Sequence, residues 1–136
     1  NFAEAHLERI IGETGVTPVL NQIELHPTFQ QKELRAVHDK LGIKTESWSP
    51  LGQGKLLANA VIGKVAAKHG RTPAQVIIRW HIDNGLIVIP KSVTPSRIEE
   101  NLRVFDFKLD ADDLAEMAKL DSAGGRIGPD PLKASF

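Results

Sequence analysis

Three short apolar stretches, separated from one another by helical patterns, constrain the fold of this chain more than any other feature. They are PVLNQIEL (18–25), IKTESW (43–48) and GLIVIP (85–90). The first and third are rich in branched side chains, which is typical of buried parallel strands. Because helices separate the strands, right-handed crossovers should join them into a parallel sheet. The sequence therefore predicts an α/β fold.

Helical periodicity fills the stretches around these strands. The predicted helices cover residues 3–13, 30–41, 61–69, 73–83, 96–104 and 112–120. Thr28 with Gln31, and Thr72 with Gln75, have the spacing of a capping box. The segment 73–83 is apolar on most sides, so we expect it to be well buried.

Three parallel strands are too few to stand alone. A parallel sheet has to be covered on both faces or closed into a barrel, and three strands would leave two long edges. We therefore expect this chain to be part of a larger barrel or sheet, or to assemble with another chain. The opening Asn1-Phe2, without an initiator Met, indicates a fragment. Residues 122–136 are rich in Gly and Pro and should form an extended loop.

Composition argues against several classes of function. Seventeen basic and seventeen acidic side chains cancel, so no bulk charge attracts nucleic acid or an anionic membrane. No apolar run approaches the ~20 residues of a membrane span, and no signal peptide is recognisable. The chain has no Cys, which fits a cytoplasmic protein, and it has no Tyr. Its five His show no spacing of metal ligands, and we expect most of them on helix surfaces.

Polar residues follow the first two predicted strands at their carboxyl ends, the edge where parallel α/β folds form their sites. Gln22 needs hydrogen-bond partners, which a ligand amide or neighbouring loop backbone could supply. Trp48 could stack on a flat ring or pack in the core. Gly52-Gln53-Gly54 lets the backbone approach a phosphate, although it lacks the Ser or Thr of a Walker loop. His26, beside Glu24, has no nucleophile near it and is predicted to be structural.

The third strand is followed by a cation in an unusual position. Lys91 and Ser92 come directly after the strand, and Thr94-Pro95 has the form of a helix start. Arg97 then falls in the first turn, where the helix dipole already presents about half a positive charge. Either Arg97 is solvated or paired with Glu99 or Glu100, or it holds an anion together with Lys91, Ser92 and the first-turn amides. The three strand ends thus offer the parts needed to hold a dinucleotide.

Four stretches, in this order and spacing, resemble the aldo-keto reductase family. They are NQIELHP (21–27), SWSPLGQGK (47–55), TPAQVIIRW (72–80) and IPKSVTPSRIEEN (89–101). The resemblance is strongest to bacterial members of the 2,5-diketogluconate reductase type. Members of the family are (β/α)8 TIM barrels that bind NADPH at the carboxyl ends of the strands and reduce aldehyde and ketone carbonyls to alcohols. The resemblance implies that residues 1–121 are the C-terminal part of one such barrel, about strands 6–8 with their helices, and that residues 122–136 are its C-terminal loop.

The same resemblance implies that this chain holds most of the cofactor site. Asn1 and Gln22 match residues that bind the nicotinamide carboxamide, and Trp48 matches the aromatic residue that stacks on the nicotinamide. Arg97 matches a residue at the 2′-phosphate, which would explain a cation in the first turn. The other matching positions are Ser49, Leu51 and Gln53 along the pyrophosphate, and Lys91, Ser92, Val93, Thr94, Glu100 and Asn101 around the 2′-phosphate and adenine.

The catalytic groups of the family are not among these residues. In the family a Tyr donates the proton, assisted by Lys, Asp and His, and all four lie on the first four strands. This chain has no Tyr, so we expect it to hold no catalytic residue and to be inactive by itself. Covering its sheet edges would require the missing N-terminal half-barrel or self-association. Two alternatives are a stand-alone half-barrel that binds a phosphorylated ligand without catalysis, and a purely structural or interaction domain.

Overall fold

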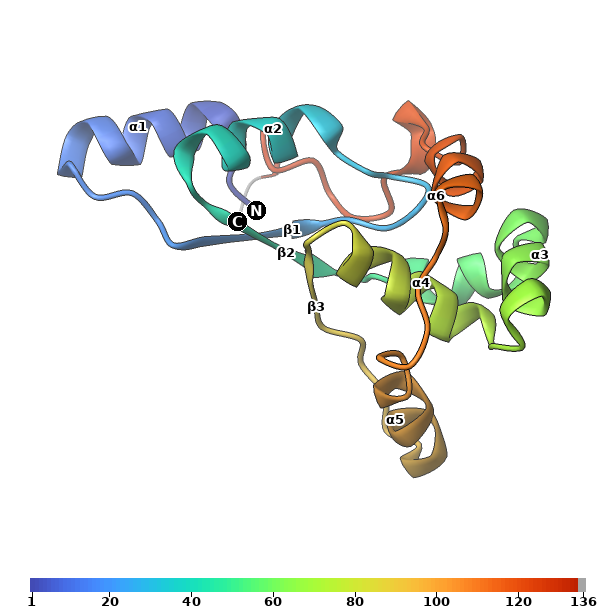
Figure 1. Ribbon diagram of the computed structural model, residues 1–136. Helices are drawn as coiled ribbons and strands as arrows, with labels where there is room; N and C mark the ends of the chain where they lie inside the picture. The colour runs from blue at the N-terminus through green and yellow to red at the C-terminus, as the bar shows by residue number, and fades with distance from the viewer. Residues whose placement is uncertain (135–136) are drawn as a thin grey trace.

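The computed structural model describes residues 1–134, which form a three-stranded parallel sheet packed against helices (Figure 1). The strands lie in the order β1-β2-β3, which confirms the predicted parallel sheet. The strands are β1 (Leu20–Glu24), β2 (Lys44–Trp48) and β3 (Ile87–Val88). The helices are α1 (Glu4–Thr14), α2 (Lys32–Leu41), η1 (Gly52–Ala58), α3 (Ala60–His69), α4 (Pro73–Asp83), α5 (Pro95–Leu102), α6 (Ala111–Ala118) and η2 (Ala123–Gly125).

One of the two predicted capping boxes forms and the other does not. At α4 the Thr72 hydroxyl accepts the Gln75 amide at 3.3 Å, and the Gln75 side chain accepts the Thr72 amide at 3.1 Å. The prediction at Thr28 is wrong, because α2 begins only at Lys32 and is preceded by Gln31 with φ 44°. Thr28 instead bonds to the ring of His26 at 3.0 Å. The Thr28 side chain is thus bonded within the loop between β1 and α2 and does not cap a helix.

The core lies between the sheet and the helices that follow it. Helix α4 is buried on most sides, as its sequence predicts, and Trp80 is only 2% exposed. Close packing of branched side chains from several elements gives such a core its low tolerance for volume changes. The core residues include Ile23 from β1 and Leu25 just after it, Ile62 and Val65 from α3, Val76, Ile77 and Trp80 from α4, and Met117 from α6.

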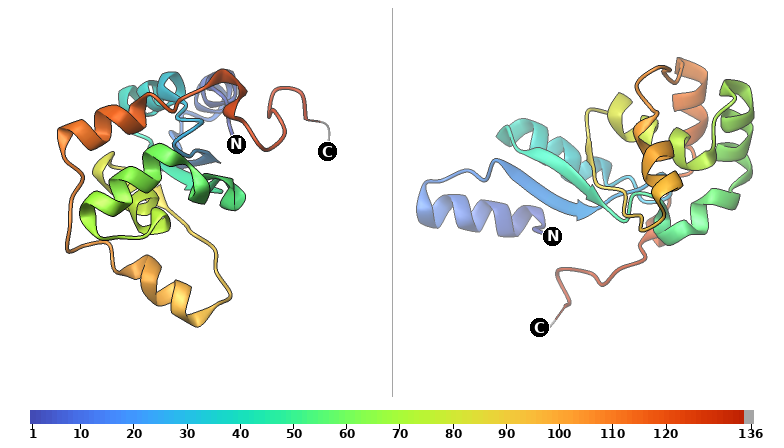
Figure 2. Two further views of the ribbon diagram at one scale, coloured as in Figure 1. Left: turned by 90° about the vertical axis from the view of Figure 1, so that its right-hand side faces the viewer. Right: turned by 90° about the horizontal axis from the view of Figure 1, so that it is seen from below.

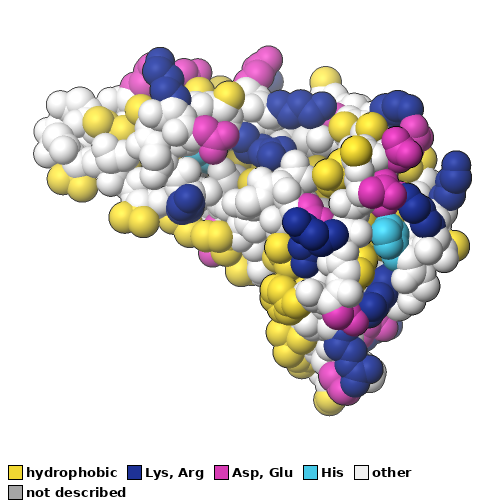
Figure 3. Space-filling view, in the orientation of Figure 1, with side chains coloured by type: hydrophobic (Ala, Val, Ile, Leu, Met, Phe, Trp, Pro, Cys, Tyr) yellow, Lys and Arg dark blue, Asp and Glu magenta, His cyan; other side chains and the backbone are white. Residues whose placement is uncertain are grey.

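The two faces of the sheet differ. Asn21 and Thr45 point toward α2, where both bond to His38. Residues of the opposite face are exposed or half-buried; they include Leu20, Gln22, Lys44, Glu46 and Ile87. Hydrophobic side chains gather along the lower edge of the molecule in Figure 3. On the exposed face of the sheet, Leu20 is 38% and Ile87 40% exposed. Within residues 1–134 the C-terminal segment covers this face only at Glu24 and Trp48, and Leu20, Lys44 and Ile87 stay exposed.

Three of the five histidines are buried, which corrects the prediction that most lie on helix surfaces. His26, His38 and His81 are each 0% exposed. Both ring nitrogens of His81 lie near backbone oxygens, at 2.8 Å from Ile77 and 3.2 Å from Leu25. Burial lowers the pKa of His81 to about 4, so the ring is neutral at pH 7. His38 joins α2 to β1 and β2, and His81 joins α4 to Leu25, the residue after β1.

No group of three or more His, Asp or Glu side chains in residues 1–134 is placed to hold a metal ion. No helix in the same residues has the length and apolar character needed to cross a membrane.

Helices α3 and α6 are joined by a buried carboxylate. Asp113 is 4% exposed and accepts hydrogen bonds from Lys68 Nζ at 2.8 Å and His69 Nε2 at 2.7 Å. Burial by itself would raise the pKa of Asp113, but these bonds and the Asp110 amide lower it to about 2. The ionised form is therefore the one that the folded state stabilises.

Asp113→Asn should lower the free energy of unfolding near pH 7 by about 2 kcal/mol, the energy that corresponds to a pKa lowered from 3.8 to about 2. Because the folded-state pKa is the lower one, this stabilisation is complete above about pH 4 and is lost as the pH falls toward about 2. Urea unfolding at several pH values measures it. Asp112→Asn, at an exposed carboxylate in the same turn, is the control and should change little. A difference that stays constant between pH 7 and about pH 2 would contradict the assignment.

Candidate functional site

Three of the predicted site residues lie together near the carboxyl ends of β1 and β2: Asn1, Gln22 in the middle of β1, and Trp48 at the end of β2. The Trp48 Nε1–H group donates to Asn1 Oδ1 at 2.6 Å. The α-amino group of Asn1 donates to the Gln22 carbonyl oxygen at 2.6 Å. The side-chain amide of Gln22 donates to Glu46 Oε1 at 2.5 Å. The carboxamides of Asn1 and Gln22 and the indole of Trp48 therefore lie close together near the carboxyl ends of the strands, and each has a hydrogen-bond partner.

Asn21 holds this group in place, and the sequence analysis did not assign it a role. Its Oδ1 accepts the Phe2 amide at 3.1 Å, and its Nδ2 donates to the Phe2 carbonyl oxygen at 2.8 Å. The Asn21 side chain thus forms the same pair of hydrogen bonds with Phe2 that the backbone of a neighbouring strand would form. His38 Nε2 lies 2.9 Å from Asn21 Nδ2 and holds the side chain on the side of α2. A polar residue at the helix-facing position of a buried strand is the signal that would have indicated this role.

The loop after β2 is held in conformations that few residues adopt. Ser49 has φ 50° and Gln53 has φ 55°, both in the left-handed region. Gly52 has φ 58°, and a Cβ there would lie 2.7 Å from Cγ of the core residue Leu56. Leu51 is half-buried against the core. The backbone therefore turns sharply around Leu56 and leaves Gln53 exposed.

The loop after β3 presents the other predicted residues to solvent. Lys91, Val93, Thr94 and Arg97 are exposed, and Ser92 is half-buried. The Ser92 hydroxyl accepts the Thr94 amide at 3.2 Å, which shapes the turn into α5. Thr94 is the N-cap, as predicted, but its own side chain caps no amide. The first turn of α5 is thus open to a ligand.

The local partners proposed for Arg97 are engaged elsewhere. Glu99 pairs with Arg103, and Glu100 accepts a hydrogen bond from the Thr72 hydroxyl at 2.9 Å. Within residues 1–134, Arg97 forms no ion pair. The salt-bridged alternative is therefore wrong, which leaves a solvated cation or an anion contact.

Helix α5 stands apart from the other helices and is joined mainly to α4 (Figure 2). None of its residues is buried. Gln75 Nε2 donates to the backbone oxygens of Glu100 and Arg103, both at 3.1 Å. Asn101 is half-buried in the last turn. The two groups of predicted residues, one around Trp48 and one around Arg97, share no hydrogen bond within the described residues.

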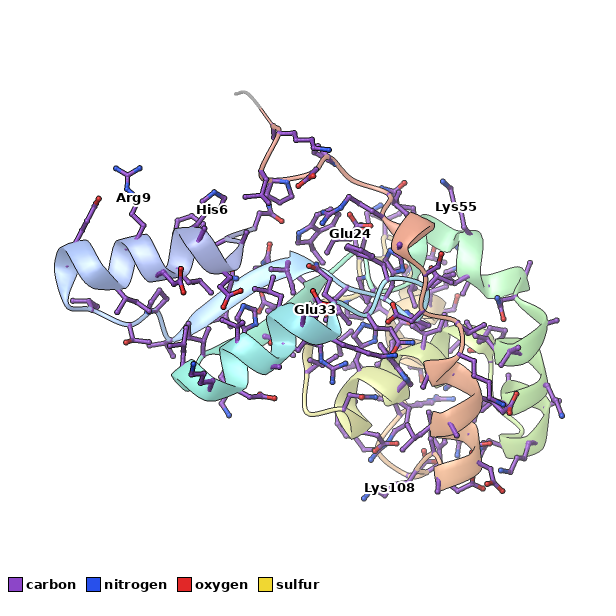
Figure 4. The ribbon with its side chains drawn as sticks, turned by 90° about the horizontal axis from the view of Figure 1, so that it is seen from above. His6, Arg9, Glu24, Glu33, Lys55 and Lys108 are labelled. Carbon is purple, nitrogen blue, oxygen red and sulfur yellow. The ribbon has the colours of Figure 1, made fainter. Side chains whose placement is uncertain are left out.

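Glu24 lies at the end of β1 beside the C-terminal segment (Figure 4). It is 1% exposed, and its carboxylate accepts backbone amides from Ile127 at 2.5 Å and Gly128 at 2.8 Å. His26 Nε2 lies 3.1 Å from the same carboxylate, and the Thr28 hydroxyl lies 3.0 Å from Nδ1. Burial lowers the pKa of His26, against the effect of Glu24. The structural role predicted for His26 agrees with these contacts.

A sequence model described as Aldo/keto reductase family matches residues 1–122. The chain belongs to the aldo/keto reductase family. It is 61% identical over 133 residues to methylglyoxal reductase DkgA of Escherichia coli K12, which covers 96% of the chain and 48% of that protein. It is 59% identical to an aldo-keto reductase of Mycolicibacterium smegmatis, with 100% of the chain and 49% of that protein covered.

Solved aldo/keto reductase structures have the same fold. A crystal structure of a Gox0644 mutant in complex with NADPH has a TM-score of 0.98 and 61% identity, covering all of this chain and 50% of that one. An aldo-keto reductase from a deep-sea metagenome has a TM-score of 0.93 at 34% identity. The chain spans about half the length of the curated relatives it matches. Its fold is accordingly that of part of an aldo/keto reductase barrel, as the sequence predicted.

Proposed function

We propose that this chain forms most of the NADPH site of an aldo-keto reductase that reduces aldehyde and ketone carbonyls to alcohols. The observation that carries the proposal is the indole of Trp48, held by Asn1 beside Gln22 where two parallel strands end. Two relatives support it by name: one was crystallised with NADPH, and another is a methylglyoxal reductase. Methylglyoxal carries both an aldehyde and a ketone carbonyl.

The residues at the ends of β1 and β2 fit a nicotinamide. A carboxamide offers two N–H donors and one acceptor oxygen, and the side chains of Asn1 and Gln22 have the complementary groups. The ring of Trp48 has a π-face on which a flat ring can stack. Its Nε1–H bond to Asn1 fixes the orientation of the indole before a ligand arrives. NADPH would supply the hydride; this chain's part is to orient and hold the nicotinamide ring.

The loops after β2 and β3 fit the phosphates. Ser49 and Gln53 have left-handed backbone conformations in a sharp turn, a type of geometry in which backbone amides can face an anion. Lys91, Arg97 and the amides of α5 form a second anion site, in which the guanidinium can bind a phosphate through two N–H groups. Both sites lie on the side of the sheet where the strands end. We assign the pyrophosphate to the first and the 2′-phosphate to the second.

The exposed face of the sheet implies a partner. We infer that an N-terminal half-barrel, or a second copy of this chain, covers Leu20, Ile87 and the hydrophobic side chains around them, which are exposed here. The proton donor of the family is a Tyr, and this chain has none. The proton-donating groups would therefore come from the covering half. A half-barrel that binds a phosphorylated ligand without catalysis is the alternative.

Binding of NADPH should quench the fluorescence of Trp48, and Trp48→Phe should abolish most of that quench while retaining most of the affinity. The reason is that Phe keeps an aromatic face for stacking but lacks the indole fluorophore. Titration of NADPH, with emission and calorimetry in parallel, measures both quantities. Trp80, buried in α4, is the internal control. A quench that persists in Trp48→Phe would place the nicotinamide elsewhere, and equal quenching by inorganic phosphate would favour the alternative.

A further inference from the structure

The segment after α6 follows the loop between β1 and α2 closely. Asp121 accepts the Gln30 amide at 2.8 Å, and the Ser122 amide donates to the Thr28 carbonyl oxygen at 3.2 Å. A Cβ at Gly125 would lie 1.8 Å from that same carbonyl oxygen, so no larger residue fits there. The guanidinium of Arg126 lies over the ring of Phe29, 4.6 Å from its centre. The segment is therefore docked by specific contacts along its length.

The Glu24 carboxylate is the buried anchor of this segment. Both of its oxygens accept backbone amides from the segment, Oε1 from Ile127 and Oε2 from Gly128. The third contact is to His26, whose Nε2 lies 3.1 Å from Oε1. A hydrogen bond from a backbone amide to a carboxylate is stronger than one between neutral groups. Glu24 accepts two such bonds and is only 1% exposed, so water does not compete for them.

Gly128 links this anchor to Trp48. A Cβ at Gly128 would lie 2.4 Å from Cη2 of Trp48 and 3.0 Å from Glu24 Oε2. Cη2 lies at the benzene end of the indole, whereas the Nε1 atom that bonds to Asn1 lies at the other end. The ring is thus held at both ends, by the first residue of the chain and by the C-terminal segment.

We propose that Glu24 is a positioning residue: its carboxylate latches residues 126–128 against Trp48 and thereby fixes the orientation of that ring. Glu24 acts through the segment, since the hydrogen bonds go to Ile127 and Gly128 and the contact with the indole is made by Gly128. Glu24→Gln removes the latch with almost no change in volume. The amide would present N–H donors to at least one backbone N–H donor, so one of the two bonds is lost and the other weakened.

Limited trypsin digestion tests the latch. In Glu24→Gln, cleavage after Arg126 should be faster by about ten-fold or more, because an unlatched segment opens more often. Cleavage after Arg79, buried in α4, reports global unfolding and should stay unchanged. Glu33→Gln, at an exposed carboxylate in the first turn of α2, is the matched control. Unchanged cleavage after Arg126, or an increase only in step with cleavage after Arg79, would overturn the proposal.

Trp48 emission tests the coupling to the ring. Gly128→Ala should shift the emission as Glu24→Gln does, because an added methyl cannot lie beside the indole. The shift in Trp48 emission in the double variant should equal the shift in either single variant, because the two changes act through the same contact. Gly124→Ala, where the new Cβ would meet only Ser122 Oγ at 3.8 Å, should leave the emission unchanged. All shifts should vanish in a Trp48→Phe background; emission unaffected by both variants would refute the coupling.

These measurements need no cofactor, so they are independent of the proposed NADPH site. If that proposal holds, Glu24→Gln should also weaken NADPH about ten-fold, since an unfixed ring has to be ordered on binding. A shifted emission with unchanged NADPH affinity would count against the stacking role of Trp48 and would leave the latch supported.

Discussion

A polypeptide of these 136 residues should show no carbonyl-dependent oxidation of NADPH, even where it binds the cofactor. General acid catalysis contributes about a hundred- to ten-thousand-fold, and the chain has no phenol to act as the acid. The uncovered sheet face would also leave the nicotinamide open to water, so the positioning that hydride transfer needs would be lost. NADPH absorbance with a panel of aldehydes and ketones, using protein of verified mass, measures this. Saturable turnover by this polypeptide would show that its own residues are catalytic.

A chimera provides the positive control. DkgA is 61% identical over the matched 133 residues, so this chain should replace the matching half of that protein with few disturbed contacts. The chimera should reduce methylglyoxal, whereas the 136 residues alone should not. If the chimera folds and binds NADPH but fails to reduce methylglyoxal, the proposal that this chain is the cofactor half of such an enzyme is wrong.

Arg97→Ala should weaken NADPH by roughly ten- to a hundred-fold and NADH much less. A guanidinium–phosphate hydrogen bond is worth about 1.5–3 kcal/mol, and only NADPH carries the 2′-phosphate. The contact is available, because Arg97 is exposed and forms no ion pair within residues 1–134. Calorimetric titration of both cofactors, with this chain or with the chimera, measures the ratio.

Arg103→Ala is the matched control for that experiment. Arg103 lies just after α5, is 66% exposed and pairs with Glu99, so its loss removes a cation from the same helix at the other end. It should change the affinity for both cofactors little, because exposed ion pairs contribute little. Equal losses of NADPH and NADH in Arg97→Ala would exclude a specific 2′-phosphate contact.

The sequence by itself determined the three strands, the six α-helices to within a few residues, and the family. The strands β1, β2 and β3 fall within the predicted stretches, because short apolar runs separated by amphipathic helical segments are typical of parallel strands. Thr72 and Gln75 form their capping box because both partners lie within one turn and no distant residue competes. Four ordered motifs were enough to identify the family. Periodicity, caps and motifs are all local signals.

Only the tertiary structure decided which polar side chains are buried and what they hold. His38 and His81 look like helix-surface residues in the sequence, but the packing of α2 and α4 against the sheet buries both. Glu24 bonds to Ile127, 103 residues away along the chain. Such a contact depends on where the chain returns after α6, which no local propensity encodes. Buried amides and carboxylates need hydrogen-bond partners. The amides of Ile127 and Gly128 can meet the Glu24 carboxylate only after the core has formed and brought the two segments together.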